Sequence, residues 1–119
     1  MNTSARFFLG VLVPAFILAG VTAIPATAEV VKPKVLVEND KVRVYEVRFK
    51  PGDEGEALAR PFRVVRALQG GTIMRTYADG KTETVEWKTG EVKLRGPDPV
   101  FTPKNVGKTQ IWLYIVQPK

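Results

Sequence analysis

The chain has 119 residues, a formal net charge of +6, and neither cysteine nor histidine. Disulfides, thiol catalysis and histidine acid–base chemistry are therefore excluded. Its 18 lysines and arginines are scattered, whereas a nucleic-acid interface needs them clustered with aromatic residues, so we expect no nucleic-acid partner.

The N-terminal segment predicts export. Residues 7–24 are apolar apart from glycine and Thr22, and Ala26-Thr27-Ala28 matches the A-x-A cleavage pattern. We predict a signal peptide over residues 1–28, cleavage after Ala28, and a periplasmic or secreted domain over residues 29–119. The alternative is an uncleaved anchor, because the apolar run is about long enough to span a bilayer. Membrane contact is expected only in that case.

The remaining chain consists of short apolar runs divided by turn residues. The runs cover residues 35–38, 42–49, 63–68, 72–77, 82–87, 91–95, 100–102 and 110–116. In 42–49 the alternation slips at Tyr45-Glu46, which predicts a β-bulge. After residue 28, no segment longer than two turns has the helical period. About eight short strands at this spacing predict an all-β, single-domain jelly-roll barrel or sandwich.

Two turns and the last strand support more specific predictions. Asp79-Gly80 lies between two strand-like runs and predicts a type I′ hairpin. Residues 96–99 read Gly-Pro-Asp-Pro and predict a loop, because the two prolines remove backbone donors. The run 110–116 is apolar at both parities, which predicts a strand covered on both faces.

The segment from Gly52 to Gly71 has the spacing of a known motif, G-x5-H-x-H-x3,4-E-x6-G, without a gap. The two histidine positions hold Leu58 and Arg60, and the glutamate position holds Val64. This is the first motif of the cupins, the RmlC-like jelly-roll barrels, and the chain resembles that superfamily in its glycine frame.

The segment from Gly90 to Asn105 resembles the second cupin motif, G-x5-P-x-G-x2-H-x3-N. Gly96 stands at the proline position, Asp98 at the glycine position and Phe101 at the histidine position. The resemblance covers about residues 35–116 and implies a jelly-roll barrel. It also implies a homodimer, formed through edge strands.

Cupin metals are held by histidines and a carboxylate, and in this chain none of those positions has a histidine or a carboxylate. Leu58, Val64 and Phe101 would turn the ligand cluster into apolar lining. We therefore predict a divergent member with no metal, no cofactor and no catalytic residue. A site made of carboxylates alone, from Glu54, Glu56 and Asp98, is the alternative.

Arg60 is the main candidate for ligand binding, because its position points into the barrel in the cupins that the chain resembles. A guanidinium in an apolar barrel mouth would bind a carboxylate or phosphate. Arg66 is expected to point inward with Val64, and Arg63 to be more exposed. The alternative for Arg60 is a structural role, in which it either extends to the barrel rim or pairs with a loop acid such as Glu56. The complete predicted ligand-binding set is Leu58, Arg60, Val64, Arg66, Arg75 and Phe101.

These features predict an exported, metal-free barrel that binds a small anionic molecule without catalysis. Two alternatives stay open. One is a structural or protein-interaction barrel whose interior is filled by side chains. The other is a metal-independent enzyme of isomerase or lyase type, which would need a Glu, Tyr or Lys with a shifted pKa.

Overall fold

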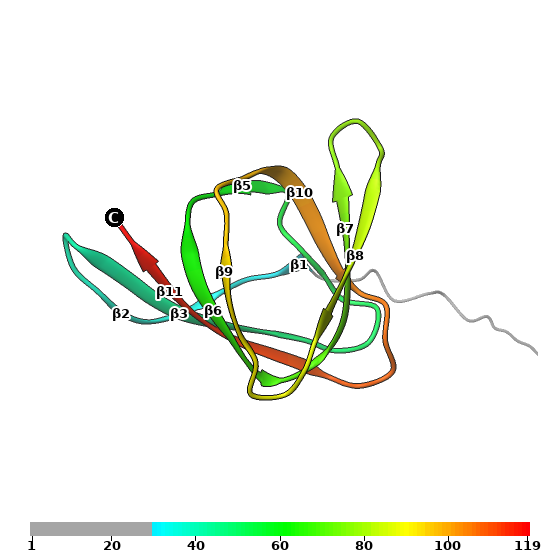
Figure 1. The fold of residues 1–119 in the computed structure, drawn as a ribbon, viewed down its shortest axis with the longest axis horizontal. Coiled ribbons are helices and arrows are strands. Elements are labelled where there is room, and N and C mark those ends of the chain that lie inside the picture. Colours follow the sequence, from blue (N-terminus) through cyan, green and yellow to red (C-terminus); the bar gives the residue numbers. More distant parts are fainter. Residues whose placement is uncertain (1–29) are drawn as a thin grey trace, which may run out of the picture.

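The computed structural model describes residues 30–119, which form β-strands joined by turns (Figure 1). The predicted signal peptide and its cleavage site lie outside the described residues. One sheet has six strands: β1 (Val30–Val31), β4 (Glu54–Gly55), β5 (Leu58–Arg60), β7 (Gly71–Tyr77), β8 (Thr82–Trp87) and β10 (Asp98–Asn105). The other has five: β2 (Lys34–Glu38), β3 (Val42–Phe49), β6 (Arg63–Gln69), β9 (Val92–Arg95) and β11 (Ile111–Pro118).

The two sheets wrap around a common interior (Figure 1). The first follows the order β1-β4-β10-β7-β8, with β5 also paired to β10, and the second follows β2-β3-β11-β6-β9. The fold is all-β, as predicted. The eleven described strands exceed the predicted eight because β1, β4 and β5 have only two or three residues, too few to show a period. Within residues 30–119 there is no helix long and apolar enough to cross a membrane.

The core lies between the sheets and is built from the inward positions of alternating strands. Its buried members are Tyr45, Phe49, Val65, Ala67, Ile73, Val85, Trp87, Ile111 and Ile115. Burial of each large apolar side chain contributes about 1.5–3 kcal/mol, so this cluster is the main stabilising feature of the fold. Lys93 of β9 extends to β8, where its ammonium donates to the Glu86 carbonyl at 2.7 Å and lies over the Trp87 ring.

The side chains of strand β6 point to the opposite faces of the sheet from those predicted. Arg63, Val65 and Ala67 are buried, whereas Val64 is half-buried and Arg66 is exposed. The run Val64-Val65-Arg66-Ala67 has no clear alternation, and a shift of one residue moves every side chain to the other face. Pairing with β11 decides the phase, because it sets Val65 opposite the core residue Ile115. The predictions that Arg66 and Val64 point inward and that Arg63 is exposed are wrong.

Three local predictions need correction. The bulge lies on β2, where Leu36 falls between the pairs Val35–Tyr45 and Val37–Val44. The β7–β8 hairpin has a three-residue loop: the Tyr77 amide donates to the Lys81 carbonyl, and Gly80 has a φ of 88°. Strand β10 begins at Asp98, inside the predicted loop, because Asp98 already pairs with Arg60 of β5.

Within residues 30–119, other elements pack against only one of the two faces of strand β11. Its inward residues Ile111 and Ile115 are buried, as predicted. Its outward residues Trp112, Tyr114 and Val116 are half-buried by their neighbours within the sheet, and Arg48 stacks over the Trp112 ring at 3.9 Å. The prediction that both faces of this strand are covered is therefore correct for the inner face and wrong for the outer face, within residues 30–119.

Candidate functional site

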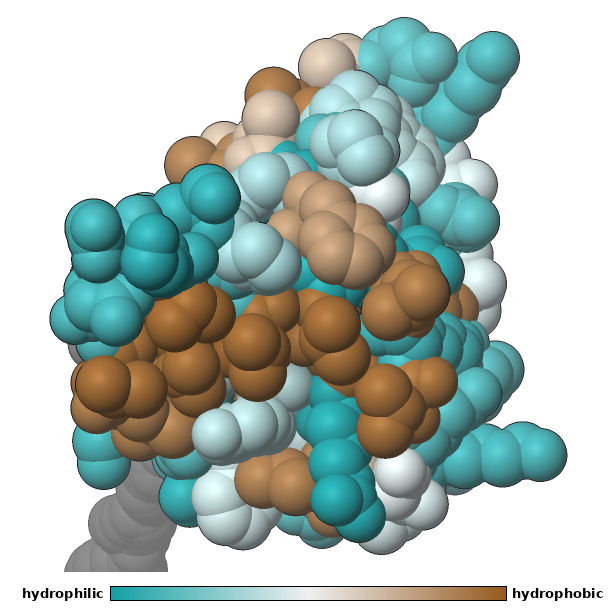
Figure 2. All heavy atoms as spheres, turned by 60° about the vertical axis from the view of Figure 1, so that its left-hand side comes forward, coloured by the Kyte–Doolittle hydropathy of each residue, from teal (hydrophilic) through white to brown (hydrophobic). Residues whose placement is uncertain are grey.

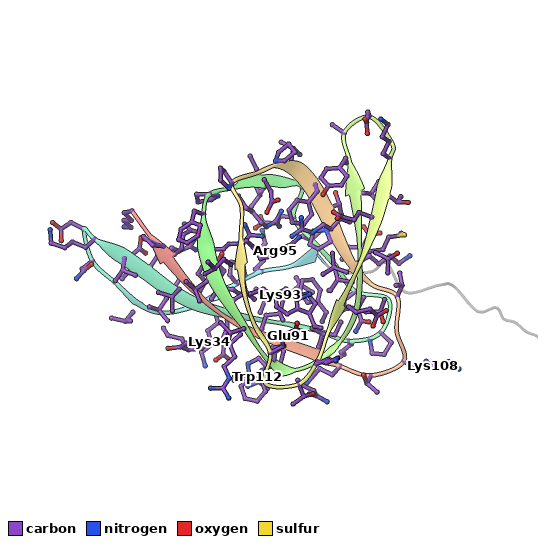
Figure 3. All side chains as sticks on the ribbon, in the orientation of Figure 1. Lys34, Glu91, Lys93, Arg95, Lys108 and Trp112 are labelled. Atoms are coloured by element: carbon purple, nitrogen blue, oxygen red, sulfur yellow. The ribbon has the colours of Figure 1, made fainter. Side chains whose placement is uncertain are left out.

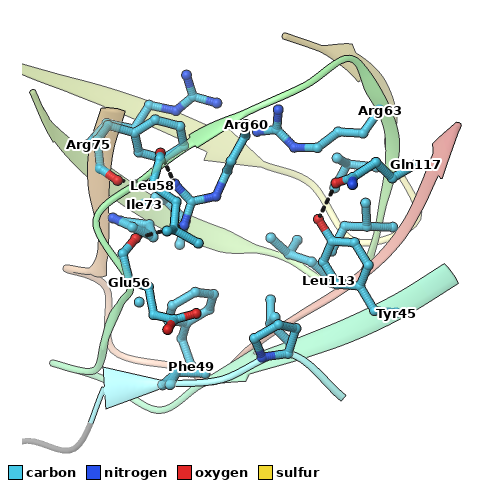
Figure 4. Close-up of a pocket in the computed structure, with 18 of the residues that line it drawn as sticks. Tyr45, Phe49, Glu56, Leu58, Arg60, Arg63, Ile73, Arg75, Leu113 and Gln117 are labelled. Carbon is cyan, nitrogen blue, oxygen red and sulfur yellow. Dashed lines mark hydrogen bonds between the residues drawn. The ribbon is translucent and has the colours of Figure 1, made fainter. Parts of the chain in front are cut away.

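A cavity of about 230 Å³ lies between the two sheets (Figure 4). Its apolar wall is formed by core residues of both sheets, namely Val47, Phe49, Val65, Ile73, Trp87, Leu113 and Ile115. Polar side chains also line it: Arg43, Tyr45, Glu56, Arg60, Arg63, Arg75 and Gln117. The barrel is therefore incompletely filled by its own side chains.

Arg60 binds the backbone at the end of the barrel. Its Nη1 donates to the carbonyls of Leu58 at 2.9 Å and Phe101 at 3.0 Å, and its Nη2 donates to the carbonyl of Glu56 at 2.8 Å. Its guanidinium also lies 4.4 Å from the centroid of the Phe101 ring. Burial, and then the nearby charge of Arg63, lower the pKa of Arg60. The guanidinium is thus held rigidly in an environment that disfavours its charge.

Asp98 connects two buried arginines. Arg63 Nη1 donates to its Oδ2 at 3.0 Å, and Arg75 Nη1 donates to its Oδ1 at 3.2 Å. Gly96 makes the turn that places Asp98 there, since its φ is 85° and a Cβ would lie 2.7 Å from the Pro61 carbonyl oxygen. Burial works to raise the pKa of Asp98, but the hydrogen bonds and charges of Arg63 and Arg75 outweigh it and lower the pKa.

Positive charge exceeds negative charge at this end of the cavity. Arg60, Arg63 and Arg75 carry three positive charges. Asp98 pairs with Arg63 and Arg75, and the exposed carboxylate of Glu83 lies 3.9 Å from Arg75. Within residues 30–119 Arg60 has no carboxylate at salt-bridge distance. The carboxylate of Glu56, its predicted partner, is 3.3 Å from the Lys32 ammonium instead. The predicted ion pair of Arg60 with Glu56 is therefore wrong, and backbone carbonyl oxygens accept from Arg60 instead.

A second polar group lies on the opposite wall. The Tyr45 hydroxyl donates to Gln117 Oε1 at 3.2 Å, and the Arg43 guanidinium lies 4.8 Å from the Tyr45 ring centroid. Burial raises the pKa of Tyr45, against the opposing effect of the nearby arginines. This hydroxyl therefore stays protonated at neutral pH, and because its one proton is donated to Gln117, its oxygen is left to accept a hydrogen bond from a ligand.

Four of the six predicted ligand-binding residues line the cavity, namely Leu58, Arg60, Arg75 and Phe101. Val64 and Arg66 do not, because β6 has the opposite phase. Sequence reasoning missed Arg63 as a lining residue and Asp98 as the partner of two arginines. The signal for Arg63 was its parity with Val65, and the signal for Asp98 was its charge inside the second motif.

The residues at the cupin metal positions do not fit a metal ion. Those positions hold Leu58, Arg60, Val64 and Phe101, which offer hydrocarbon and a cation where a metal needs lone pairs. In residues 30–119 no three His, Cys, Asp or Glu side chains converge. Asp98, one member of the alternative carboxylate set, is already engaged by Arg63 and Arg75. We therefore derive no chemistry through a metal.

Two sheets closing around an apolar cavity define a small jelly-roll barrel, and comparison with solved structures gives its class. A cupin domain from Bordetella pertussis aligns with a TM-score of 0.70 and 22% identity, over 78% of this chain and 97% of that one. The cupin domain of Schizosaccharomyces pombe Cnp3 aligns with a TM-score of 0.58 and 19% identity, over 82% and 72%. An RmlC-like cupin protein with a double-stranded β-helix fold from Methanocaldococcus jannaschii aligns at 0.57 and 13%, over 81% and 86%.

The chain therefore has the cupin fold, as its two glycine-framed motifs predicted. No family model matches the sequence, and no curated protein matches it. At these identities the likeness establishes the fold, and function has to be argued from the cavity itself.

Proposed function

We propose that the cavity binds a small organic anion with an apolar body, without catalysis. The observation that carries this proposal is the excess of guanidinium charge over carboxylate at one end of an apolar cavity. The anionic group would lie against Arg60 and Arg75, and the body against the apolar wall. The cavity is smaller than the roughly 300–1,000 Å³ of sites for drug-sized ligands, so the ligand would be correspondingly small.

Both alternative functions are less well supported than binding. A filled barrel would leave no cavity of about 230 Å³. An acid–base enzyme needs a group whose pKa is moved toward neutrality, whereas Asp98 has a lowered pKa and Tyr45 a raised one. Both shifts hold these groups in their ordinary protonation state at neutral pH.

Binding can be tested by thermal shift with a panel of small carboxylates and phosphates, each beside its neutral amide or ester. We expect the anions to raise the melting temperature and the neutral analogues to have no effect. Leu58→Glu introduces a negative charge at the cavity, on a side chain that is 47% exposed and should tolerate it. It should weaken anion binding about tenfold, which corresponds to about 1.4 kcal/mol.

The matched control is Val106→Glu, which makes the same charge change at a site that is 45% exposed and outside the cavity. Arg60→Ala should also weaken binding, but it removes three hydrogen bonds to the backbone and so lowers stability as well. Equal affinities in the Leu58→Glu and Val106→Glu variants would contradict binding in the cavity.

We further propose that the protein is exported and acts as the domain 29–119. The support is the apolar segment followed by Ala26-Thr27-Ala28. Expressed in bacteria, the full chain should lose residues 1–28, and the intact mass of envelope material should match a chain that begins at Glu29. A mass that retains Met1 would show an uncleaved anchor instead.

A further inference from the structure

The outer face of the five-stranded sheet has an apolar row that crosses every strand. Directly paired residues lie on the same face of a sheet, so the pairs of neighbouring strands connect end to end. From β2 to β9 the row consists of Val37, Val44, Val116, Val64 and Leu94. Figure 2 shows a continuous hydrophobic band across one face of the molecule.

The apolar row is exposed where it ends. Val37 is 59% exposed and Leu94 is 70% exposed, and Val92, on the same face of β9, is also exposed. The outer positions of an antiparallel sheet that faces water normally hold polar residues. A continuous aliphatic row at such positions is typical of a surface that contacts a protein or a membrane.

A row with an excess of basic residues lies beside the apolar row. It consists of Lys34, Glu46, Tyr114 and Arg66, each paired with the next across β2, β3, β11 and β6. The carboxylate of Glu46 is 3.4 Å from the guanidinium of Arg48, so this acid is neutralised within its own strand. Within residues 30–119 neither Lys34 nor Arg66 has a carboxylate at salt-bridge distance, and both side chains are exposed. These two positive charges are therefore free to bind an anionic group.

Two large aromatic side chains lie on the basic side of the apolar row. Tyr114 is part of the basic row, and Trp112 is the neighbouring outward residue of β11, with Arg48 over its ring at 3.9 Å. Figure 3 shows Lys34 and Trp112 at the outer side of this sheet, with Lys108 at the far end of the molecule. Tryptophan and tyrosine are enriched where lipid tails meet water, because they combine an apolar ring with a polar group. Across the face, an aliphatic row is thus followed by basic and aromatic residues.

We propose that this face binds the surface of an anionic lipid bilayer. The aliphatic row enters the boundary of the acyl chains, and Lys34 and Arg66 contact the lipid phosphates beside it. Lysine and arginine suit that depth, because their stems lie along apolar surface while the charge stays in water. Membrane-surface binding strengthens both with the apolar area that is buried and with attraction to anionic lipids, and this face has both. The sequence predicts membrane contact only through an uncleaved anchor, because the residues of this face come from five separate strands.

The test is sedimentation of the chain 29–119 with lipid vesicles. This chain contains all eleven described strands and the described core, and it lacks the apolar segment that could bind vesicles by itself. Vesicles of phosphatidylcholine with about 30% phosphatidylglycerol should bind it, and vesicles of phosphatidylcholine alone should bind it at least about tenfold more weakly. Raising the salt concentration from about 0.1 M to about 0.5 M should also weaken binding, because salt screens the lipid charge.

Leu94→Glu tests the apolar row, and Arg66→Glu tests the basic row. Each should lower the vesicle partition coefficient by about tenfold or more while keeping the melting temperature, because both side chains are exposed. The matched controls make the same changes elsewhere: Val100→Glu on β10 of the other sheet, where Val100 is also exposed, and Lys108→Glu in the turn between β10 and β11. Both controls should bind within about twofold of wild type.

Three results would overturn the proposal. A wild type that does not bind anionic vesicles would exclude a bilayer as the occupant. Equal losses in Leu94→Glu and Val100→Glu, or in Arg66→Glu and Lys108→Glu, would show an effect of net charge alone. Light scattering without vesicles gives the third: if copies of the chain associate, Leu94→Glu separates them and vesicles are not bound, the face belongs to a second copy.

Discussion

Asp98→Ala should destabilise the fold by about 3–5 kcal/mol, because it leaves two buried cations without their shared carboxylate. Arg63 and Arg75 are 5% and 4% exposed, and both donate to Asp98. Arg63 keeps one acceptor, the Pro61 carbonyl at 3.1 Å. Arg75 keeps a long contact to the Tyr77 hydroxyl and the exposed Glu83 carboxylate at 3.9 Å. For a domain of this size the melting temperature should fall by roughly 12 °C or more.

The pH dependence separates this mechanism from a general loss of packing. Since the pKa of Asp98 is lowered below its ordinary value of 3.8 in the folded state, its ionised form stabilises the fold above that pH. The contribution is lost as the pH falls through the lowered pKa. Urea unfolding should therefore show a constant difference between wild type and Asp98→Ala at neutral pH, and a smaller difference below about pH 4.

Asp40→Ala is the matched control for this experiment, because Asp40 is exposed in the turn between β2 and β3. It should change the unfolding free energy by less than about 0.5 kcal/mol. If Asp98→Ala behaved like Asp40→Ala, the description of Asp98 as the shared partner of Arg63 and Arg75 would be wrong.

The sequence predicted those parts of the fold whose signals are local. Strands β3 and β8 begin and end where their runs and turns indicated, at Val42–Phe49 and Thr82–Trp87. The phase of β6 was predicted wrongly because it is decided by pairing with β11, which lies more than forty residues away in the chain. Alternation of apolar and polar residues shows which face of a strand points inward, and the two adjacent valines Val64 and Val65 break that alternation.

The site was predictable to the extent that it follows the two motifs. The frame placed Arg60 and Phe101 at the cavity, and both line it. The motif spacing could not show that three backbone carbonyls accept hydrogen bonds from Arg60 in place of the Glu56 carboxylate. Those contacts depend on the register in which β5 pairs with β10. The Gly-Pro-Asp-Pro pattern predicts a loop at Asp98, and only the sheet register brings this residue between Arg63 and Arg75.

Asn105 is the second residue whose loss should have a large effect. It is 1% exposed, and its Nδ2 donates to the carbonyls of Phe49 at 2.9 Å and Thr109 at 2.8 Å. Its Oδ1 accepts from the Gly107 amide at 2.9 Å. The side chain therefore links the end of β3 to the turn between β10 and β11. It occupies the asparagine position of the second motif, and here its role is structural.

Asn105→Ala should cost about 3 kcal/mol or more, because each buried polar group left without a partner costs about 1–3 kcal/mol. The control is Asn39→Ala, since Asn39 also accepts from two backbone amides through its side chain but does so in an exposed turn. That variant should lose about 1 kcal/mol, because water can replace the lost bonds. Urea unfolding of both variants measures the difference, and equal losses would contradict the buried role of Asn105.

Asn105→Asp tests the direction of the hydrogen bonds with little change in shape. The new carboxylate can still accept from Gly107, but its other oxygen would face the Phe49 and Thr109 carbonyls, which can only accept. Repulsion and burial should raise the pKa of this carboxyl above the ordinary value of about 3.9. Its protonated form then stabilises the fold, and that stability is lost as the pH rises through the raised pKa. The melting temperature of this variant relative to wild type should therefore increase on acidification from about pH 8 to about pH 5, whereas a difference independent of pH would show that Nδ2 does not donate to these carbonyls.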